Sequence, residues 1–400
     1  MRPFECIFCK KTYPPDPFSL FCTKCKEPLL AASPETTCKI HSAREYPLEK
    51  YIDFLPINEF SPGLSLGEGS TPLLKLNRLR DEFNLPYLYA KNEMLNPTGS
   101  FKDRGTVVAV HRAVSMGIQQ IGTVSTGNMA VSTGAYGARA GLKTLVLVSE
   151  DVSDEKLYSA GIHGTILFKV KGDYGTLFYK SLEIGKKKKI YFMNSVDPFR
   201  IEGYKVTAFE MFEQFKGKIP THIFVPVSSG GHIIGLMKAF KELKQSGLTD
   251  TYPVFIGIQP EKASPIARAF LKGDLKYSRI RKAESLAQSI NNPAPPGGNI
   301  VLKMIYELNG EVLYVTDDEI RTAQRLLASY EGLFCLPASA TSLAGAFKLK
   351  NDKKLAPSDR IVLILTGSGI KNIKVLEPNK MKVFTTSLNK LDRTLSSAVI

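Results

Sequence analysis

The sequence lacks any apolar run of the length that a membrane span requires. A transmembrane helix needs roughly 20 consecutive apolar residues, whereas the hydrophobic residues, 43% of this chain, are dispersed in short segments. The first residues, Met1-Arg2-Pro3-Phe4-Glu5, also lack the pattern of a secretory signal. We therefore expect a cytoplasmic protein with no membrane partner.

Acidic residues are the minority among the charged ones, with 38 Asp and Glu against 53 Lys and Arg and a net charge of +15. A basic excess is typical of nucleic-acid-binding proteins when it is clustered on one face. The one dense basic run, KKKK at 186–189, precedes the apolar segment 190–193, and we interpret it as a solvated loop before a strand. We therefore expect no nucleic-acid partner, only a general attraction for anionic substrates.

Cysteine is also scarce, with six residues in the chain, but four of them form two closely spaced pairs. Cys6 and Cys9 form one C-x-x-C pair, and Cys22 and Cys25 form the second after twelve intervening residues. Two such pairs can converge on one tetrahedral metal ion, and zinc suits four thiolates in a reducing compartment. The sequence therefore predicts a closed, structural zinc knuckle. Iron in a rubredoxin-like site and a nucleic-acid-binding ribbon are the alternatives.

The length of 400 residues exceeds the size at which a single core stops growing, so two lobes are expected. Short apolar strands alternate with helical segments, and this βαβα order predicts an α/β fold with mostly parallel sheets flanked by helices and right-handed crossovers. The expected parts are a knuckle at 1–32, a connecting arm at 33–66, a large lobe at 67–109 and 191–375, a small lobe at 110–190 and a C-terminal tail at 376–400.

The segment Asn96-Pro97-Thr98-Gly99-Ser100-Phe101-Lys102-Asp103-Arg104-Gly105 places a lysine behind a turn-forming loop, at the mouth of a predicted helix. A lysine in this position can bind an aldehyde cofactor covalently, while the helix terminus faces the cofactor's anionic groups. Lys102 is therefore the predicted catalytic residue. An ordinary turn followed by a solvated lysine is the alternative interpretation.

Two further loops follow predicted strands and contain small polar residues. Ser125-Thr126-Gly127-Asn128 precedes a helix, where its amides and hydroxyls could bind the carboxylate of an amino acid. Ser228-Ser229-Gly230-Gly231-His232 also precedes a helix, and its small residues would let backbone amides approach a phosphate. As isolated motifs, both are equally compatible with helix caps and tight turns.

These motifs, in this order, closely resemble those of the fold-type-II pyridoxal-phosphate enzymes related to the tryptophan synthase β-subunit, and most of all the threonine synthases. The resemblance extends from about residue 67 to residue 371. It implies two open, mostly parallel sheets with the cofactor between the lobes. The implied cofactor contacts are Lys102, Asn128, Ser228, Ser229, Gly230, Gly231, His232 and Thr366. The implied substrate contacts are Ser125, Thr126, Gly127, Asn128, Asn194, Ser195 and Arg200.

The resemblance also implies an activity and a set of partners. The expected reaction converts O-phospho-L-homoserine and water to L-threonine and phosphate with pyridoxal 5′-phosphate as cofactor, and the expected assembly is a homodimer. Some of these relatives carry a similar N-terminal cysteine knuckle.

The chain departs from the common family pattern at two places. It has Ser228 to His232 where many members have Gly-Asn-Ala-Gly-Asn, and Met129 where a hydroxyl residue is common. These differences leave the phosphorylated substrate open. β-Replacement on O-phosphoserine, as in cysteate synthase, a serine or threonine dehydratase, and a cofactor-binding protein without catalysis are the alternatives.

Overall fold

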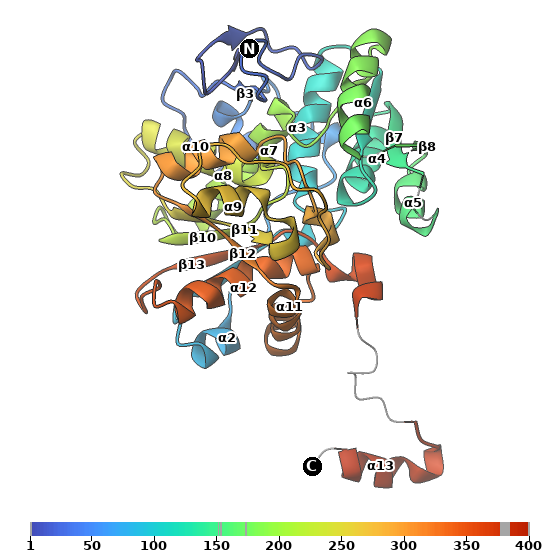
Figure 1. Cartoon of the computed structure of the whole chain (residues 1–400), viewed down its shortest axis with the longest axis vertical. Coiled ribbons are helices and arrows are strands. Elements are labelled where there is room, and N and C mark those ends of the chain that lie inside the picture. The colour runs from blue at the N-terminus through green and yellow to red at the C-terminus, as the bar shows by residue number, and fades with distance from the viewer. Residues whose placement is uncertain (1, 151, 153, 173, 377–384, 399–400) are drawn as a thin grey trace.

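The computed structural model (Figure 1) describes residues 2–150, 152, 154–172, 174–376 and 385–398. Its strands form a three-stranded, a six-stranded and a four-stranded sheet. Of the tail expected at 376–400, residues 377–384 and 399–400 lie outside the described residues, and α13 (Leu391–Ala398) is the helix near its end.

The six-stranded sheet forms the large lobe and has the strand order β12-β11-β10-β13-β5-β4. All neighbouring strands are parallel except β4, which pairs antiparallel with β5 at one edge. Parallel neighbours cannot be joined by hairpins, so helices connect them. The strands are β4 (Leu73–Lys75), β5 (Leu88–Asn92), β10 (His222–Pro226), β11 (Val254–Pro260), β12 (Glu311–Val315) and β13 (Ile361–Leu365).

Both faces of this sheet are buried, which explains why its strands are continuously apolar. Along β13, Val362 and Ile364 join one hydrophobic cluster, while Ile361, Leu363 and Leu365 join another on the opposite face. The first cluster includes residues of α3 (Lys102–Ser115), α7 (Pro198–Gln214), α8 (Gly231–Gln245), α9 (Pro265–Leu271) and α10 (Gly298–Glu307). The second includes residues of α2 (Asn77–Glu82), α11 (Asp317–Glu331) and α12 (Pro337–Asn351).

The four-stranded sheet forms the small lobe, with the order β8-β7-β6-β9 and only parallel pairs. Its last strand, β9, occupies the first two residues beyond the lobe boundary that the sequence suggested at residue 190. The strands are β6 (Gln120–Val124), β7 (Lys143–Ser149), β8 (Ile166–Val170) and β9 (Tyr191–Phe192). The helices are α4 (Asn128–Arg139), α5 (Asp154–Gly161) and α6 (Tyr174–Lys188).

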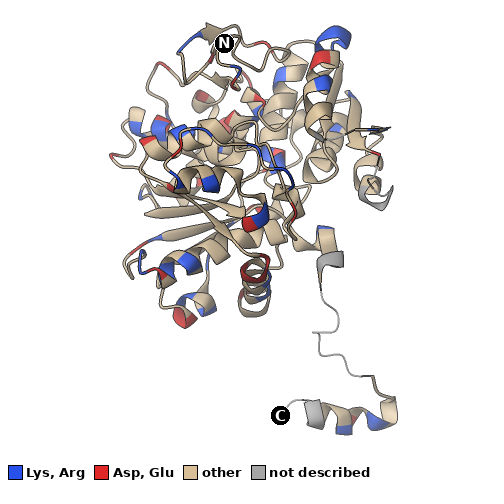
Figure 2. Cartoon of the chain, in the orientation of Figure 1, with Lys and Arg blue, Asp and Glu red and all other residues tan. Residues whose placement is uncertain are grey.

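The basic run at 186–189 is mostly helical, so its interpretation as a loop was wrong. Lys186, Lys187 and Lys188 form the last turn of α6 and are exposed. Positive side chains are favourable at a helix C-terminus because they face the negative end of the helix dipole. Figure 2 shows the other Lys and Arg residues scattered over many elements.

The N-terminal segment packs on the large lobe through α7. Strands β1 (Phe4–Glu5), β2 (Thr12–Tyr13) and β3 (Leu30–Ala31) form the small antiparallel sheet, and the Phe4 ring lies 5.1 Å from that of Phe199. The following segment, which includes α1 (Pro47–Lys50), runs over the same helix, with Phe54 4.4 Å from Phe209 between ring centroids.

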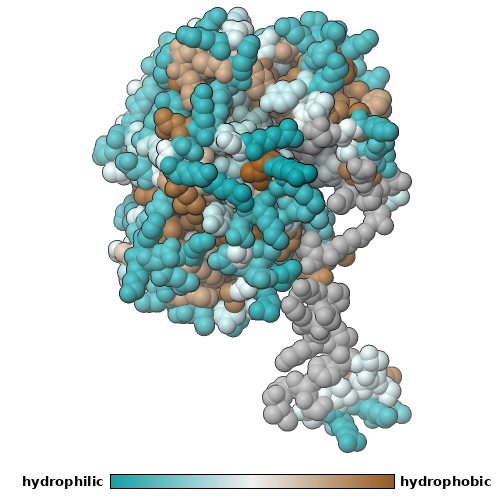
Figure 3. All heavy atoms as spheres, in the orientation of Figure 1, coloured by the Kyte–Doolittle hydropathy of each residue, from teal (hydrophilic) through white to brown (hydrophobic). Residues whose placement is uncertain are grey.

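Figure 3 shows hydrophilic side chains over most of the visible face, with hydrophobic ones in separate small groups. Among the described residues, no helix has both the length and the apolar character needed to cross a membrane.

Candidate active site

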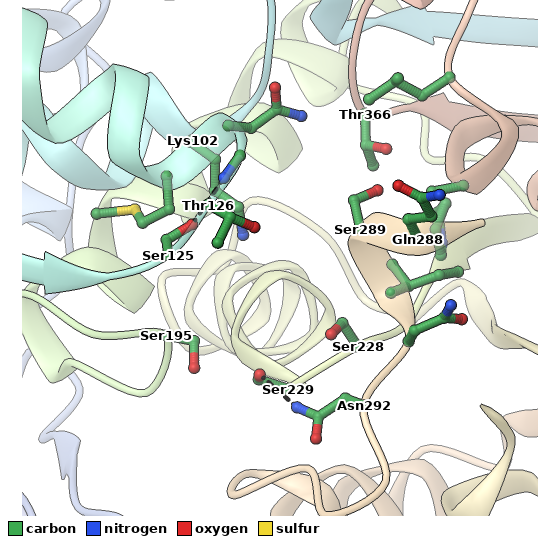
Figure 4. Close-up of a pocket in the computed structure, with 18 of the residues that line it drawn as sticks. Lys102, Ser125, Thr126, Ser195, Ser228, Ser229, Gln288, Ser289, Asn292 and Thr366 are labelled. Carbon is green, nitrogen blue, oxygen red and sulfur yellow. Dashed lines mark hydrogen bonds between the residues drawn. The ribbon is translucent and has the colours of Figure 1, made fainter. Parts of the chain in front are cut away.

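A cavity of about 720 Å³ lies where the loops after several parallel strands meet. The loops follow β6, β10 and β13, and Lys102 enters from the start of α3. Carboxyl ends of parallel strands are the usual place for ligand sites in α/β folds. In Figure 4, Ser125 and Thr126 lie beside Lys102, and Thr366 also faces the cavity. All but one of the sequence-predicted cofactor and substrate residues line this cavity.

Lys102 is held at the first position of α3 by the turn that precedes it. Gly99 has a φ of +72°, which favours glycine. The Phe101 N–H donates to the Thr366 carbonyl at 3.0 Å, which ties the turn to the end of β13. Asp103 accepts hydrogen bonds from the backbone and the hydroxyl of Thr98 at 2.7 and 2.6 Å. The lysine therefore projects from a fixed backbone.

Two glycines bring α3 and α7 into close contact beside Lys102. A Cβ on Gly203 would lie 2.0 Å from the Arg104 carbonyl oxygen, and one on Gly105 would lie 2.8 Å from the Arg200 carbonyl oxygen. No side chain fits at either position. The crossing places Arg200 near Lys102, whose pKa is lowered to about 7 by burial and, to a smaller extent, by the Arg200 charge. Much of the amine is therefore neutral, and so nucleophilic, near pH 7.

A buried ionic network lies behind the lysine loop. Arg104 donates to Glu93 and to Glu210, with Nη2 2.8 Å from Glu93 Oε1 and 2.7 Å from Glu210 Oε2. Lys91 Nζ lies 2.7 Å from the same Glu210 oxygen. Burial alone would raise the pKa of Glu210, but Arg104 and Lys91 outweigh it and lower the pKa to about 2. Arg104 and the two carboxylates therefore stay ionised, and their hydrogen bonds anchor the start of α3.

The loop between β10 and α8 presents backbone amides to the cavity. Gly230 has a φ of +98° and is the N-cap of α8, with no capping side chain. The first N–H groups of a helix have no acceptor within the helix, and the helix dipole is positive at this end. Ser228 to His232 all line the cavity. This arrangement suits an anion.

Several buried polar atoms in the same cavity have no hydrogen-bond partner among the described residues. They are Ser195 Oγ, Arg200 Nε and both ring nitrogens of His232. The His232 ring stacks on Phe101 at 3.9 Å, and burial lowers its pKa to about 3, so the imidazole is neutral at neutral pH. Unpartnered buried polar groups are costly. A ligand with several acceptor oxygens, such as a phosphate ester, would accept hydrogen bonds from Ser195 Oγ, Arg200 Nε and the protonated ring nitrogen of His232.

The start of α4 and the end of β13 join the two lobes at the cavity. The Asn128 side-chain nitrogen would lie 3.2 Å from a Cβ on Gly367, so the start of α4 approaches the end of β13. Thr366 is 7% exposed, and its hydroxyl pairs with the Ser339 hydroxyl at 2.8 Å. Ser125 Oγ accepts from the Gly127 N–H at 3.3 Å, which shapes the turn before α4.

Asn194 is the predicted site residue that does not line the cavity. Its Oδ1 accepts from the Val124 N–H and its Nδ2 donates to Ser181 Oγ, both at 3.0 Å. With 1% of its surface exposed, Asn194 holds β6 and α6 together, so the structure does not support the substrate contact expected for it.

The cavity also contains residues that the sequence reasoning did not assign. Gln288, Ser289 and Asn292 come from η5 (Gln288–Ile290) and from the loop after it. Asn292 donates to Ser229 Oγ at 3.0 Å (Figure 4). The Asn-Asn-Pro order at 291–293 indicates a turn, but nothing in the sequence connects that turn with Ser229.

The cysteine pairs form a possible metal centre away from the cavity. The four sulfur atoms of Cys6, Cys9, Cys22 and Cys25 lie within 4.8 Å of one another, and those of Cys9 and Cys22 are 3.7 Å apart. Zinc–sulfur bonds of about 2.3 Å in a tetrahedron place sulfurs about 3.8 Å apart. The donor set and its spacing therefore fit zinc.

The chain is similar to known proteins along most of its length. Residues 64–367 match the family model for pyridoxal-phosphate-dependent enzymes. The chain is 39% identical to the threonine synthase of Methanocaldococcus jannaschii and 35% identical to that of Methanosarcina acetivorans, with 92% and 93% of each chain covered. Threonine deaminase isoform 2 from Solanum lycopersicum has the same fold, with a TM-score of 0.67, 20% identity and coverage of 84% of this chain and 85% of that one.

Proposed function

The chain belongs to the threonine synthase family of pyridoxal-phosphate-dependent enzymes, and we propose that its substrate is O-phospho-L-homoserine, which it converts with water to L-threonine and phosphate. The observation that carries this proposal is the position of Lys102. Its amine faces a cavity that has an anion-binding loop at the start of α8 and a second polar loop at the start of α4.

The residues present fit pyridoxal 5′-phosphate. We propose that Lys102 holds it covalently, that the loop from Ser228 to His232 binds its phosphate, and that Asn128 and Thr366 contact its ring. When bound, the cofactor supplies the electron sink that stabilises negative charge on the substrate's carbons. The Thr366 hydroxyl is neutral and already paired with Ser339. A ring nitrogen beside it therefore need not be protonated.

Lys102 would also move protons during the reaction. Its amine has a pKa of about 7, so it can accept a proton from a substrate carbon and return it at neutral pH. The proton transfers assigned to it are removal from the α-carbon and from the β-carbon. The two protons return to the γ-carbon, which becomes the methyl group of threonine, and to the α-carbon. Phosphate leaves from the γ-carbon, and water adds its hydroxyl at the β-carbon while its remaining proton goes to the phosphate, which completes the balance.

The substrate's two anionic groups would bind on different walls. The turn from Ser125 to Asn128 faces the cavity and would bind the α-carboxylate. Ser195 and Arg200 would bind the substrate phosphate, because Ser195 Oγ and Arg200 Nε lack partners among the described residues. The other Arg200 nitrogens are occupied, by the carbonyls of Met193 and Asn194 and by the Tyr204 hydroxyl. The guanidinium is therefore held in one orientation.

Three further proposals concern the whole protein. We propose that the four cysteines hold a structural zinc ion, which the spacing of their sulfur atoms supports. A homodimer and a cytoplasmic location are proposals that rest on the sequence resemblance and composition.

The test is a product analysis with purified holoenzyme. O-Phospho-L-homoserine should yield threonine and phosphate in equal amounts, and Lys102→Ala should yield neither. Parallel reactions with O-phosphoserine plus sulfite, and with serine or threonine alone, should give no cysteate and no oxo acid. Cysteate or an oxo acid as the main product would reject the proposed substrate in favour of another reaction on the same fold.

A further inference from the structure

Asn292 lies in the loop between η5 and α10, and its side chain reaches the anion-binding loop. Its Nδ2 donates to Ser229 Oγ, and its Oδ1 accepts from the Ala294 N–H, both at 3.0 Å. The two ends of an amide are assigned from their partners. Here the Ala294 N–H is a donor and requires the oxygen, so the nitrogen must face Ser229.

This bond determines how the Ser229 hydroxyl can be used. A hydroxyl has one hydrogen to donate and lone pairs that accept. Because Ser229 Oγ accepts from Asn292, its own hydrogen remains free, and the described residues offer it no acceptor. The adjacent groups at the start of α8 are backbone N–H donors. The hydroxyl is therefore set to donate to a ligand in the cavity.

The same segment also fixes the backbone of Ser229. The Gly297 N–H donates to the Ser229 carbonyl at 3.0 Å, and a Cβ on Gly297 would lie 2.6 Å from that oxygen. A Cβ on Gly230 would lie 2.8 Å from Val301. Asn292 therefore fixes the side chain of Ser229 and Gly297 fixes its backbone, although both lie more than 60 positions further along the chain.

We propose that Asn292 is a positioning residue that fixes the Ser229 hydroxyl as a hydrogen-bond donor to a bound phosphate monoester. The inference rests on the proposed function, which places a phosphorylated cofactor and a phosphorylated substrate in this cavity. Both present the same chemistry, three acceptor oxygens with negative charge. Hydrogen bonds to such groups are stronger than those between neutral groups.

Two substitutions test whether the orientation of the Ser229 hydroxyl, and not only the shape of the side chain at position 292, matters for ligand binding. Asn292→Ala removes the donor. Asn292→Asp keeps the shape and can still accept from Ala294, but its second oxygen attracts the Ser229 hydrogen and turns it away from the ligand. Asn299→Ala is the matched control, since Asn299 belongs to α10 and bonds to Glu27 and Tyr277 instead.

The experiment measures two quantities for each variant. One is the Kd of the apoenzyme for pyridoxal phosphate relative to that for pyridoxal, which has no phosphate. The other is the KM for O-phosphohomoserine with saturating cofactor. We expect either the Kd ratio or the KM to rise about tenfold in both Asn292 variants. Pyridoxal binding and kcat should stay within twofold of the wild type. Asn299→Ala should change neither the Kd ratio nor the KM. A change in the Kd ratio assigns the donor to the cofactor, and a change in KM assigns it to the substrate.

A double-mutant cycle tests whether Asn292 acts through Ser229. In a Ser229→Ala background, Asn292→Ala should cause no further loss. Two results would overturn the inference while leaving the proposed function intact, provided that the wild type binds cofactor and makes threonine. One is full additivity of the two losses, and the other is that the Asn292 variants cannot be distinguished from the wild type. A wild type that bound no pyridoxal phosphate would overturn both.

Discussion

Replacing Arg200 by glutamine tests how the cavity prepares Lys102 for covalent chemistry. The wild-type amine, with a pKa of about 7, is about half neutral at pH 7, whereas an unperturbed lysine with a pKa of about 10.4 would be neutral in roughly one molecule in 2,500. Burial is the larger cause and Arg200 the smaller. Removing the arginine charge should therefore raise the pKa of Lys102 only partly.

The size of this change follows from a like-charge interaction in protein. Two charges several ångströms apart at an effective dielectric constant of about 20 interact by about 2 kcal/mol, which corresponds to roughly one to two pH units. Only the neutral amine attacks the aldehyde, so a higher pKa moves the midpoint of the rate profile to higher pH. We expect the midpoint to move from about 7 to about 8 to 9 in Arg200→Gln.

The assay is the rate of covalent capture of pyridoxal phosphate by apoenzyme, followed by its visible absorption between pH 5.5 and 9.5. Rates are normalised to the high-pH plateau, so that weaker cofactor binding does not alter the midpoint. Arg200→Lys retains the charge and should keep the wild-type midpoint, and Lys102→Ala should capture nothing. A wild-type midpoint near pH 10 would contradict the lowered pKa of Lys102, and equal midpoints for wild type and Arg200→Gln would contradict the contribution of the Arg200 charge.

Three other perturbations test the framework around the site. Glu210→Gln leaves Arg104 and Lys91 with one buried carboxylate fewer, and chemical denaturation should show that the free energy of unfolding falls by about 3 to 5 kcal/mol. In the wild type, the contribution of Glu210 to stability should disappear as the pH falls from about 4.3, the pKa in the unfolded state, towards the folded pKa of about 2. Gly203→Ala inserts a methyl group 2.0 Å from the Arg104 carbonyl oxygen and should lower both Tm and cofactor capture, whereas Gly63→Ala, with only Ser61 Oγ at 3.8 Å, should not. Elemental analysis should find one zinc per chain, absent in Cys22→Ser together with a lower Tm; a coloured iron centre would contradict the zinc assignment.

The strands of the large lobe could be predicted because their environment leaves a simple pattern. A parallel strand buried on both faces is apolar at every position, as in Ile361–Leu365, and polar loops follow such strands. Lys102 could likewise be located, because a lysine behind a turn at a helix start is an arrangement with a specific chemistry. These features depend on residues close together in the sequence.

The features that could not be predicted depend on distant partners. The partners of Asn194 are Val124 and Ser181, on β6 and α6. Asn292 meets Ser229 across 63 positions of sequence. The lysines at the end of α6 were interpreted as a loop because a run of charged residues has no helical periodicity. Positive side chains are nevertheless favourable at the C-terminus of a helix. Tertiary packing determines all three cases.

Borohydride reduction of the holoenzyme shows whether the amine of Lys102 carries the cofactor. The visible absorption of the holoenzyme should disappear on reduction, and peptide mapping of the reduced protein should find the pyridoxyl group on Lys102. Attachment to another lysine, or the absence of any attached cofactor, would contradict this account of the site.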